Sequence, residues 1–300
     1  MYNDWFMNFA PEAFRNTRLK TTDDVLNTLS KTDNYKNISP KLLADNPEIL
    51  ATLRMSTCPP IAVDRLIGLA GVNSNLVKKI ENSKKLPDRM SAPELDIELS
   101  KICVIILKLL DKDIFPWLNN SDPINSEEIY RASTIIADRL CGSIANPIIR
   151  NAQEKRQLEL IKLWLEKRGY KQSGDNEKLS LDNLIPGTFA FHFNIQVKMD
   201  TSRRFVNIPV DVAIKPLGKN KKPVFLEAKS AGDFANVNKR RKEEAQKMSQ
   251  LRNTYNGDII FILFLCGYFD SGYLGYEAAE GIDWIWEHAI DELEYYLTEG

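Results

Sequence analysis

The spacing of apolar residues changes character near the middle of the chain. Up to about residue 145, apolar residues recur at steps of three and four, as in "SAPELDIELSKICVIILKLLDKD" and "NSEEIYRASTIIADRLCGSI". This is the period of amphipathic helices. Prolines separate these segments, and no segment of this half alternates with a period of two. The pattern therefore predicts an all-α N-terminal domain over residues 1–145.

The second half of the chain combines helical and strand periods. A further helix is expected over about 147–168. "TFAFHFNIQVK" and "VNIPVDVAI" then alternate apolar residues with others, which is typical of strands. The apolar run "PVFLEAKSAG", a helix near 236–254 and the strand "DIIFILFLCG" follow, and "GIDWIWEHAIDELEYYL" is expected to be helical. This order of elements predicts a mixed α/β domain over residues 146–300.

Composition and charge are those of an ordinary soluble protein. Hydrophobic residues make up 43% and charged residues 27% of the 300 residues, and the formal net charge is −1, so any site for a polyanion is a local patch. No apolar run reaches the roughly 18 residues of a membrane span, and no secretory signal is visible. Four scattered cysteines and only two histidines, His192 and His288, argue against a zinc site. We expect a cytoplasmic protein without a membrane partner.

Glu227 and Lys229 stand in a strand that is otherwise apolar. Side chains alternate between the two faces of a strand, so these two share one face, where charged groups are costly unless they are paired or used. Glu227 is the only one of 41 acidic residues with Lys two positions later. Asp211 lies on the preceding predicted strand, on the face opposite Val210 and Val212. Two neighbouring strands joined by "KPLGKNKKP" would bring Asp211 and Glu227 together.

Such a pair of carboxylates has a chemical use. Two adjacent carboxylates suit Mg²⁺, which also binds water and phosphate oxygens. The cation would activate water and stabilise the leaving oxygen of a phosphodiester. Lys229 could orient or deprotonate that water, or neutralise charge on the phosphate. The alternative is an ordinary cross-strand ion pair, which a bare Glu-x-Lys pattern does not exclude.

The same residues resemble a known nuclease signature. Asp211 and Glu227-Ala228-Lys229 resemble the PD-(D/E)xK pattern, although Pro209 stands one residue farther from the Asp than the proline of that pattern. Three longer segments resemble the XamI-like type II restriction endonucleases: "CPPIAVDRLIGLAGV", "PVFLEAKSAGDFANVNKRRKEEAQK" and "FILFLCGYFDSGYLGYEAAEGIDWIWEH". The resemblance implies a PD-(D/E)xK-type mixed β-sheet flanked by helices. It also implies Mg²⁺-dependent cleavage of both strands of duplex DNA at a short defined sequence.

The superfamily resemblance adds one more candidate for the metal site. In these nucleases the first helix of the core often contributes a glutamate to the metal, and Glu154 matches by register on the predicted sheet-facing stripe. The alternative is a helix-surface ion pair between Glu154 and Arg150.

A basic run directly follows the predicted catalytic strand. In "NVNKRRKEEAQK" the charges begin the next helix, where they could contact DNA phosphates beside the scissile bond. The alternative is a solvated helix face stabilised by Glu243 and Glu244. The candidate residues are Lys239, Arg240, Arg241 and Lys242.

A second candidate DNA contact lies in the first half, near residues 61–83. In "RLIGLAGVNSNLVKKIENSKK", Gly71-Val72 separates two amphipathic stretches, and Val77 and Ile80 have the spacing by which a helix-turn-helix packs its second helix. A plain αα-hairpin explains the same spacing. The residues that would face the major groove are Ser74, Asn75, Lys78 and Lys79.

Three functions remain compatible with the sequence. The leading one is a Mg²⁺-dependent restriction endonuclease; the others are a DNA-binding regulator with a nuclease-like scaffold and a repair or recombination nuclease. A single Asp211/Glu227/Lys229 set per chain cuts one strand, so cleavage of both strands predicts a homodimer. The aromatic residues of the last predicted helix suit core packing and a dimer contact: Trp284, Trp286, Tyr295 and Tyr296.

Overall fold

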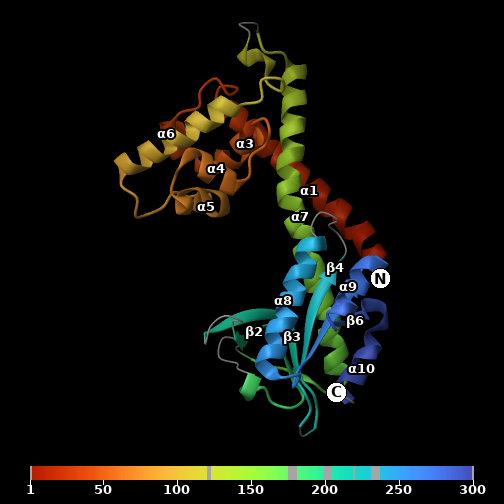
Figure 1. Ribbon diagram of the computed structural model, residues 1–300. Helices are drawn as coiled ribbons and strands as arrows, with labels where there is room; N and C mark the ends of the chain where they lie inside the picture. Colours follow the sequence, from red (N-terminus) through yellow and green to blue (C-terminus); the bar gives the residue numbers. More distant parts are fainter. Residues whose placement is uncertain are drawn as a thin grey trace. The chain divides into compact units, whose positions relative to one another are not determined.

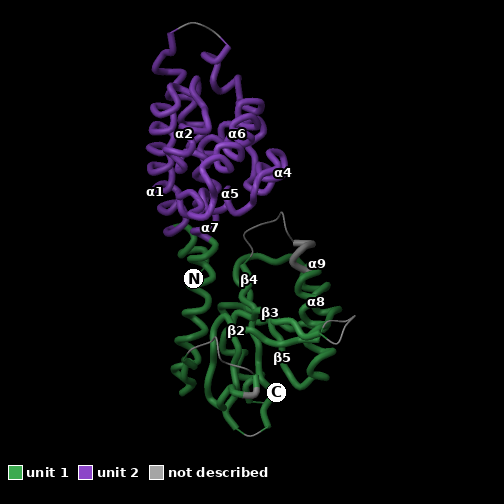
Figure 2. Tube along the Cα trace, turned by 90° about the vertical axis from the view of Figure 1, so that its left-hand side faces the viewer, with its two compact units in different colours: residues 1–7, 150–300 green, residues 8–149 purple. Residues whose placement is uncertain are grey.

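The structure of the protein is a computed structural model that describes residues 2–119, 123–174, 181–198, 204–218, 220–230 and 237–298, without the side chains of 182 and 237–241 (Figure 1). The chain forms two compact units (Figure 2). One consists of residues 8–149 and the other of residues 1–7 together with residues 150–300. The division falls between residues 149 and 150. The boundary suggested by the sequence was near residue 145.

The unit of residues 8–149 is helical in its described part, apart from one isolated bridge between Thr57 and Leu110. A single apolar core joins its helices. None of the described helices combines the length and the apolar character needed to cross a lipid bilayer. The α-helices that contribute to this unit are α1 (Tyr2–Lys31), α2 (Pro40–Asp45), α3 (Leu50–Met55), α4 (Val63–Ala70), α5 (Ser74–Ser83), α6 (Ala92–Leu109) and α7 (Ser126–Lys167).

Helix α7 corrects one prediction. The sequence suggested two helices with a break before about residue 147, whereas Ser126–Lys167 form one helix with Pro147 inside it (Figure 1). A proline removes one backbone N–H from the helix ladder, but it does not prevent the flanking turns from forming. The helix therefore continues past Pro147, and its last eighteen residues, 150–167, belong to the unit that contains the sheet.

The second unit is built on a six-stranded mixed sheet in the order β1-β2-β3-β4-β5-β6. The central strands β2, β3 and β4 are antiparallel neighbours, while the pairs β1–β2, β4–β5 and β5–β6 are parallel. This confirms the predicted mixed α/β unit and adds two short edge strands that the periodicity did not reveal. The strands are β1 (Lys171–Gln172), β2 (Thr188–Lys198), β3 (Phe205–Lys215), β4 (Val224–Ser230), β5 (Ile260–Cys266) and β6 (Asp283–Trp286).

Helices cover both faces of the sheet. The C-terminal part of α7 and the short helix α10 (Leu293–Thr298) pack on one face, in a core with Phe189, Val212 and Leu226. Helices α8 (Val237–Tyr255) and α9 (Ser271–Ala279) contribute Leu251 and Tyr273 to the core on the other face. The predicted helix near 236–254 is thereby confirmed.

The two long strands change sides at one point. In β2, Phe189 and Phe191 belong to the core under α7, but Phe193 belongs to the core under α8. The same change separates Val212 from Val210 in β3, so the prediction that Asp211 lies opposite both valines is wrong. His192, between the two phenylalanines, has a φ of 49°, in the left-handed region, which interrupts the regular alternation of faces along the strand. His192 and Asp211 therefore stand where both strands cross from one core to the other.

The C-terminal segment also differs from its prediction. Trp284 and Trp286 lie on β6 and not in a final helix. A 3-10 segment, Glu287–Glu292, follows, and only Leu293–Thr298 are α-helical. Ile285 is buried in the core under α7 and α10, so backbone pairing with β5 and this apolar contact together favour the strand.

Candidate functional site

Asp211 lies where β3 pairs with β4. Val212 is opposite Leu226, so the adjoining residues Asp211 and Glu227 are neighbours across the two strands. The Asp211 Oδ2 atom accepts a hydrogen bond from the Ala228 N–H at 2.7 Å. Burial, followed by the negative charge of Glu227, raises the pKa of Asp211 to about 6. Asp211 is thus held by the backbone of β4, and its charged form is costly as long as no cation compensates it.

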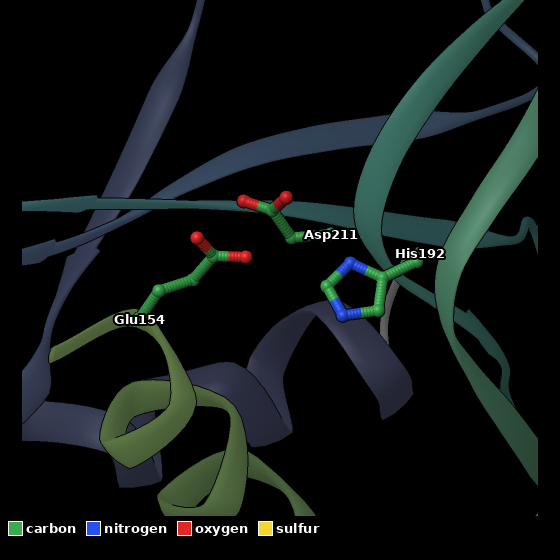
Figure 3. Close-up of side chains that lie close together, drawn as sticks. All are labelled: Glu154, His192 and Asp211. Carbon is green, nitrogen blue, oxygen red and sulfur yellow. The ribbon is translucent and has the colours of Figure 1, made fainter. Parts of the chain in front are cut away.

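Three side chains from three elements converge beside this point. Glu154 comes from α7, His192 from β2 and Asp211 from β3, and each offers one ligand atom within 4.8 Å of the others. Figure 3 shows the two carboxyl groups and the imidazole ring turned toward a common space. Two carboxylate oxygens and an imidazole nitrogen form a donor set that fits a divalent cation. Among the described residues, these three side chains form a group whose ligand atoms lie close enough together to hold a metal.

Glu227 is buried and lies between two lysines. Its Oε1 accepts a hydrogen bond from the Lys229 ammonium at 3.1 Å, and its Oε2 accepts one from Lys247 of α8 at 2.7 Å. Lys247 also donates to the Pro209 carbonyl at 2.8 Å. Both oxygens of Glu227 are therefore paired with ammonium groups, and this carboxylate is not among the three converging side chains.

Lys229 has a second acidic neighbour on α8. Its ammonium lies 3.3 Å from Glu244 Oε1, as an ion pair without the geometry of a hydrogen bond. Glu244 is buried, and its Oε2 accepts a hydrogen bond from the Tyr273 hydroxyl at 2.7 Å. Burial works against the charge of Lys229, yet Glu227 and Glu244 together raise the pKa of Lys229 above its ordinary value. The ammonium form of Lys229 is therefore the stable one at neutral pH.

Comparison with known proteins identifies the family. Residues 33–286 match the XamI restriction endonuclease family. The chain belongs to this family. It is also 50% identical over 296 residues to the type II restriction enzyme SalI of Streptomyces albus G, an alignment that covers 98% of this chain and 93% of that protein. The predicted resemblance and the predicted class of enzyme, a type II site-specific deoxyribonuclease, are confirmed.

One solved structure shows a weak similarity to this endonuclease. Protein VC1899 from Vibrio cholerae aligns with a TM-score of 0.30 and 14% sequence identity. The alignment covers 86% of this chain and 56% of that chain, so the endonuclease spans little more than half the length of VC1899. A similarity of this size carries no argument about the fold or the site.

The basic run of the endonuclease lies at the start of α8. The side chains of Lys239, Arg240 and Arg241 fall outside the described residues. Lys242 is described and is exposed. Contact between this run and DNA phosphates stays a prediction.

The hairpin predicted near 61–83 is present. Gly71, with a φ of 60°, links α4 to α5, and Val77 and Ile80 are buried. Ser74 and Asn75 are exposed, as a surface that contacts DNA requires. Two ion pairs involve the lysines: exposed Lys78 lies 3.9 Å from Asp64, and half-buried Lys79 lies 2.6 Å from Asp88. The αα-hairpin is thus observed, and its role in DNA binding stays a prediction.

Sequence reasoning missed three residues near this site. His192 was considered only as an argument against zinc, Lys247 was not considered, and Glu244 was assigned to a solvated helix face. His192 had a weak signal, because it is the one histidine in a strand whose other polar residues are Thr188, Asn194, Gln196 and Lys198. Lys247 and Glu244 are three residues apart on α8, one helical turn, and the sequence did not show that this face meets β4.

Proposed function

We propose that the endonuclease hydrolyses a phosphodiester bond in each strand of duplex DNA, using a divalent cation, Mg²⁺, held by Asp211, Glu227 and Glu154. The observation that carries the proposal is the convergence of Glu154 and Asp211 beside Glu227 on the neighbouring strand. Three carboxylates from α7, β3 and β4 form an oxygen-rich site of the kind that Mg²⁺ prefers. When bound, the cation supplies a Lewis acid that polarises the phosphate.

Lys229 contributes charge to this site. Because its pKa is raised by Glu227 and Glu244, the side chain is a proton donor and a positive charge at neutral pH, and not a base. Of the roles predicted for Lys229, stabilisation of the negative charge on the phosphate is therefore favoured over proton abstraction. Lys247 competes with a cation for Glu227, because its ammonium contacts the Oε2 atom of that carboxylate.

The arrangement supports a PD-(D/E)xK assignment. An Asp on one strand, a Glu-x-Lys on its antiparallel neighbour and a Glu on the preceding long helix occur together in this unit. Lys239, Arg240, Arg241 and Lys242 are proposed to contact phosphates near this site, and the α4–α5 hairpin is proposed to contact DNA through Ser74, Asn75, Lys78 and Lys79.

Incubation with long duplex DNA tests the proposal. We expect discrete fragments with Mg²⁺, no fragments with EDTA, and no fragments from Asp211→Asn in either condition. Glu166→Gln is a matched control, since Glu166 is an exposed carboxylate on the same helix as Glu154 and lies about 18 Å farther along its axis. Cleavage that persists in EDTA or in Asp211→Asn would contradict the metal site, and nicking that follows DNA structure rather than sequence would indicate a repair nuclease.

A further inference from the structure

We infer that His192 provides a nitrogen ligand to the cation of this site, so that the site accepts transition-metal ions such as Mn²⁺ as well as Mg²⁺. The inference rests on the proposed function, because it concerns the same cation as Asp211 and Glu154. It goes beyond that function in naming a further ligand and in the class of metal that the ligand selects.

Geometry is the first support. Ligand atoms on opposite sides of a small divalent cation lie about 4 Å apart, twice a metal–ligand distance of about 2.1 Å. The ligand atoms of Glu154, His192 and Asp211 lie within 4.8 Å of one another. These separations are close to the largest that the ligand atoms around one cation adopt. Figure 3 shows that the imidazole faces both carboxylates and does not turn away from them.

The backbone at His192 is the second support. A φ of 49° in the middle of a strand is uncommon for any residue with a Cβ atom, and such positions are destabilising unless the surrounding structure holds them. Core packing does not explain the choice of histidine, because the His192 side chain is exposed whereas Phe193 beside it is buried. The conformation instead aims the imidazole at Glu154 and Asp211.

The surroundings of His192 are the third support. His192 and Glu154 line the same cavity of about 650 Å³, together with two lysines, Lys155 and Lys162, and a further carboxylate, Glu159. The two lysines offer donors to phosphate oxygens, so a nucleic acid backbone held by them would lie next to the ligands. His192 is thus open to a cavity that also holds basic side chains.

The chemistry of the imidazole ligand determines which metal ions bind more tightly because of His192. Imidazole nitrogen suits Zn²⁺ and the other later transition-metal ions best. Mn²⁺ shares the preference of Mg²⁺ for oxygen ligands but accepts imidazole more readily than Mg²⁺ or Ca²⁺, which are bound almost entirely through oxygen. Replacing His192 should therefore weaken Mn²⁺ binding more than Mg²⁺ binding. Asparagine is the suitable replacement, since it tolerates a positive φ and lacks the imidazole.

Pulsed electron paramagnetic resonance of the full-length protein with Mn²⁺ alone tests the inference. We expect ¹⁴N coupling to bound Mn²⁺ in the wild type and in His288→Asn, and loss of this coupling in His192→Asn. The assignment is unambiguous because the chain has only two histidines. Calorimetry should show that His192→Asn weakens Mn²⁺ binding at least about tenfold, with a smaller change for Mg²⁺. Tenfold is the lower limit because losing even a residue that only supports a metal ligand weakens metal binding about 10–100-fold.

Each failure has its own signature. Mn²⁺ binding that depends on Asp211 but shows no nitrogen coupling would overturn the role of His192 and leave the proposed function standing. Coupling that is lost in His288→Asn and kept in His192→Asn would also overturn it. Absence of any divalent-cation binding, or binding that Asp211→Asn does not affect, would overturn the metal site itself and the inference with it.

Discussion

Asp211 is a residue whose surroundings favour chemistry over stability. Its carboxylate is half-buried, accepts the Ala228 N–H and lies beside the negative charge of Glu227. The ionised form of a carboxyl group in such a place is energetically unfavourable until a cation neutralises it. The same property that disposes Asp211 to bind a cation therefore reduces the stability of the metal-free fold.

This conflict gives a pH-dependent prediction. The pKa of Asp211 is about 6 in the fold against an ordinary value of 3.8, so the folded protein holds the proton more tightly than the unfolded chain. The contribution of Asp211 to stability is therefore present below its ordinary pKa and is lost as the pH rises through about 6. Asparagine keeps an oxygen for Ala228 and carries no charge. We expect Asp211→Asn to raise the free energy of unfolding, by about 1 kcal/mol more at pH 8 than at pH 5.

Urea denaturation in EDTA at both pH values measures the effect. Glu166→Gln serves again as the control, because its exposed carboxylate should change the free energy of unfolding little at either pH. An advantage of Asp211→Asn that is equal at pH 5 and pH 8 would show that the Asp211 carboxyl is not strained by its surroundings.

At the scale of elements, α8 and β4 are joined by alternating charges. Lys229 of β4 pairs with Glu244 of α8, and Lys247 of α8 pairs with Glu227 of β4. Tyr273 of α9 adds a hydrogen bond to Glu244. These contacts fix the helix against the strand that carries two of the candidate catalytic groups, so a structural role of Lys229 has to be separated from a catalytic one.

A double substitution makes this separation. Lys229→Met removes the charged partner of Glu244, whose side chain is only 2% exposed, and should cost about 3–5 kcal/mol as well as abolish cleavage. Adding Glu244→Gln removes the uncompensated charge and should restore most of the free energy of unfolding, while cleavage stays absent. Unfolding and cleavage are measured on the wild type, Lys229→Met, Glu244→Gln and the double variant. Cleavage that returns together with stability would mean that Lys229 is only a structural partner.

At the scale of the whole molecule, the homodimer stays a prediction. Each chain carries one proposed Asp211/Glu227/Lys229 set, and cleavage of both strands is most simply achieved by two copies related by a twofold axis that coincides with the dyad of the DNA sequence. The sequence suggested a dimer contact through the aromatic residues of one final helix. Two of these residues, Trp284 and Trp286, lie instead on β6. Tyr295 of α10 is 60% exposed and remains available for a contact between copies.

Sedimentation with a duplex that contains the cleavage site tests the dimer. In EDTA, which keeps the duplex intact, we expect two chains per duplex. With Mg²⁺, a plasmid with a single site should pass directly to the linear form. One chain per duplex, combined with accumulation of nicked plasmid, would show that a monomer cuts the strands in turn.

The sequence by itself determined the mixed α/β order, the strands around residues 188–198 and 205–215, and the neighbourhood of Asp211 and Glu227. These features follow from local periodicity, because the spacing of apolar residues records which positions are covered. The sequence also indicated the family. A long segment such as "PVFLEAKSAGDFANVNKRRKEEAQK" is specific to a family, whereas a three-residue signature is not.

Only the tertiary structure decided which face each residue occupies around the site. The alternation of Phe189, Phe191 and Phe193 predicts that all three side chains lie on one face of the strand. In the structure, the positive φ at His192 separates them, so that Phe189 and Phe191 lie in one core and Phe193 lies in the other. A local pattern cannot show this, because both cores are apolar and the period does not change. Nor can it show that Glu244 and Lys247 meet β4, since that contact depends on where α8 packs. The convergence of Glu154, His192 and Asp211 is decided in the same way, by three elements that are distant in sequence and adjacent only in the fold.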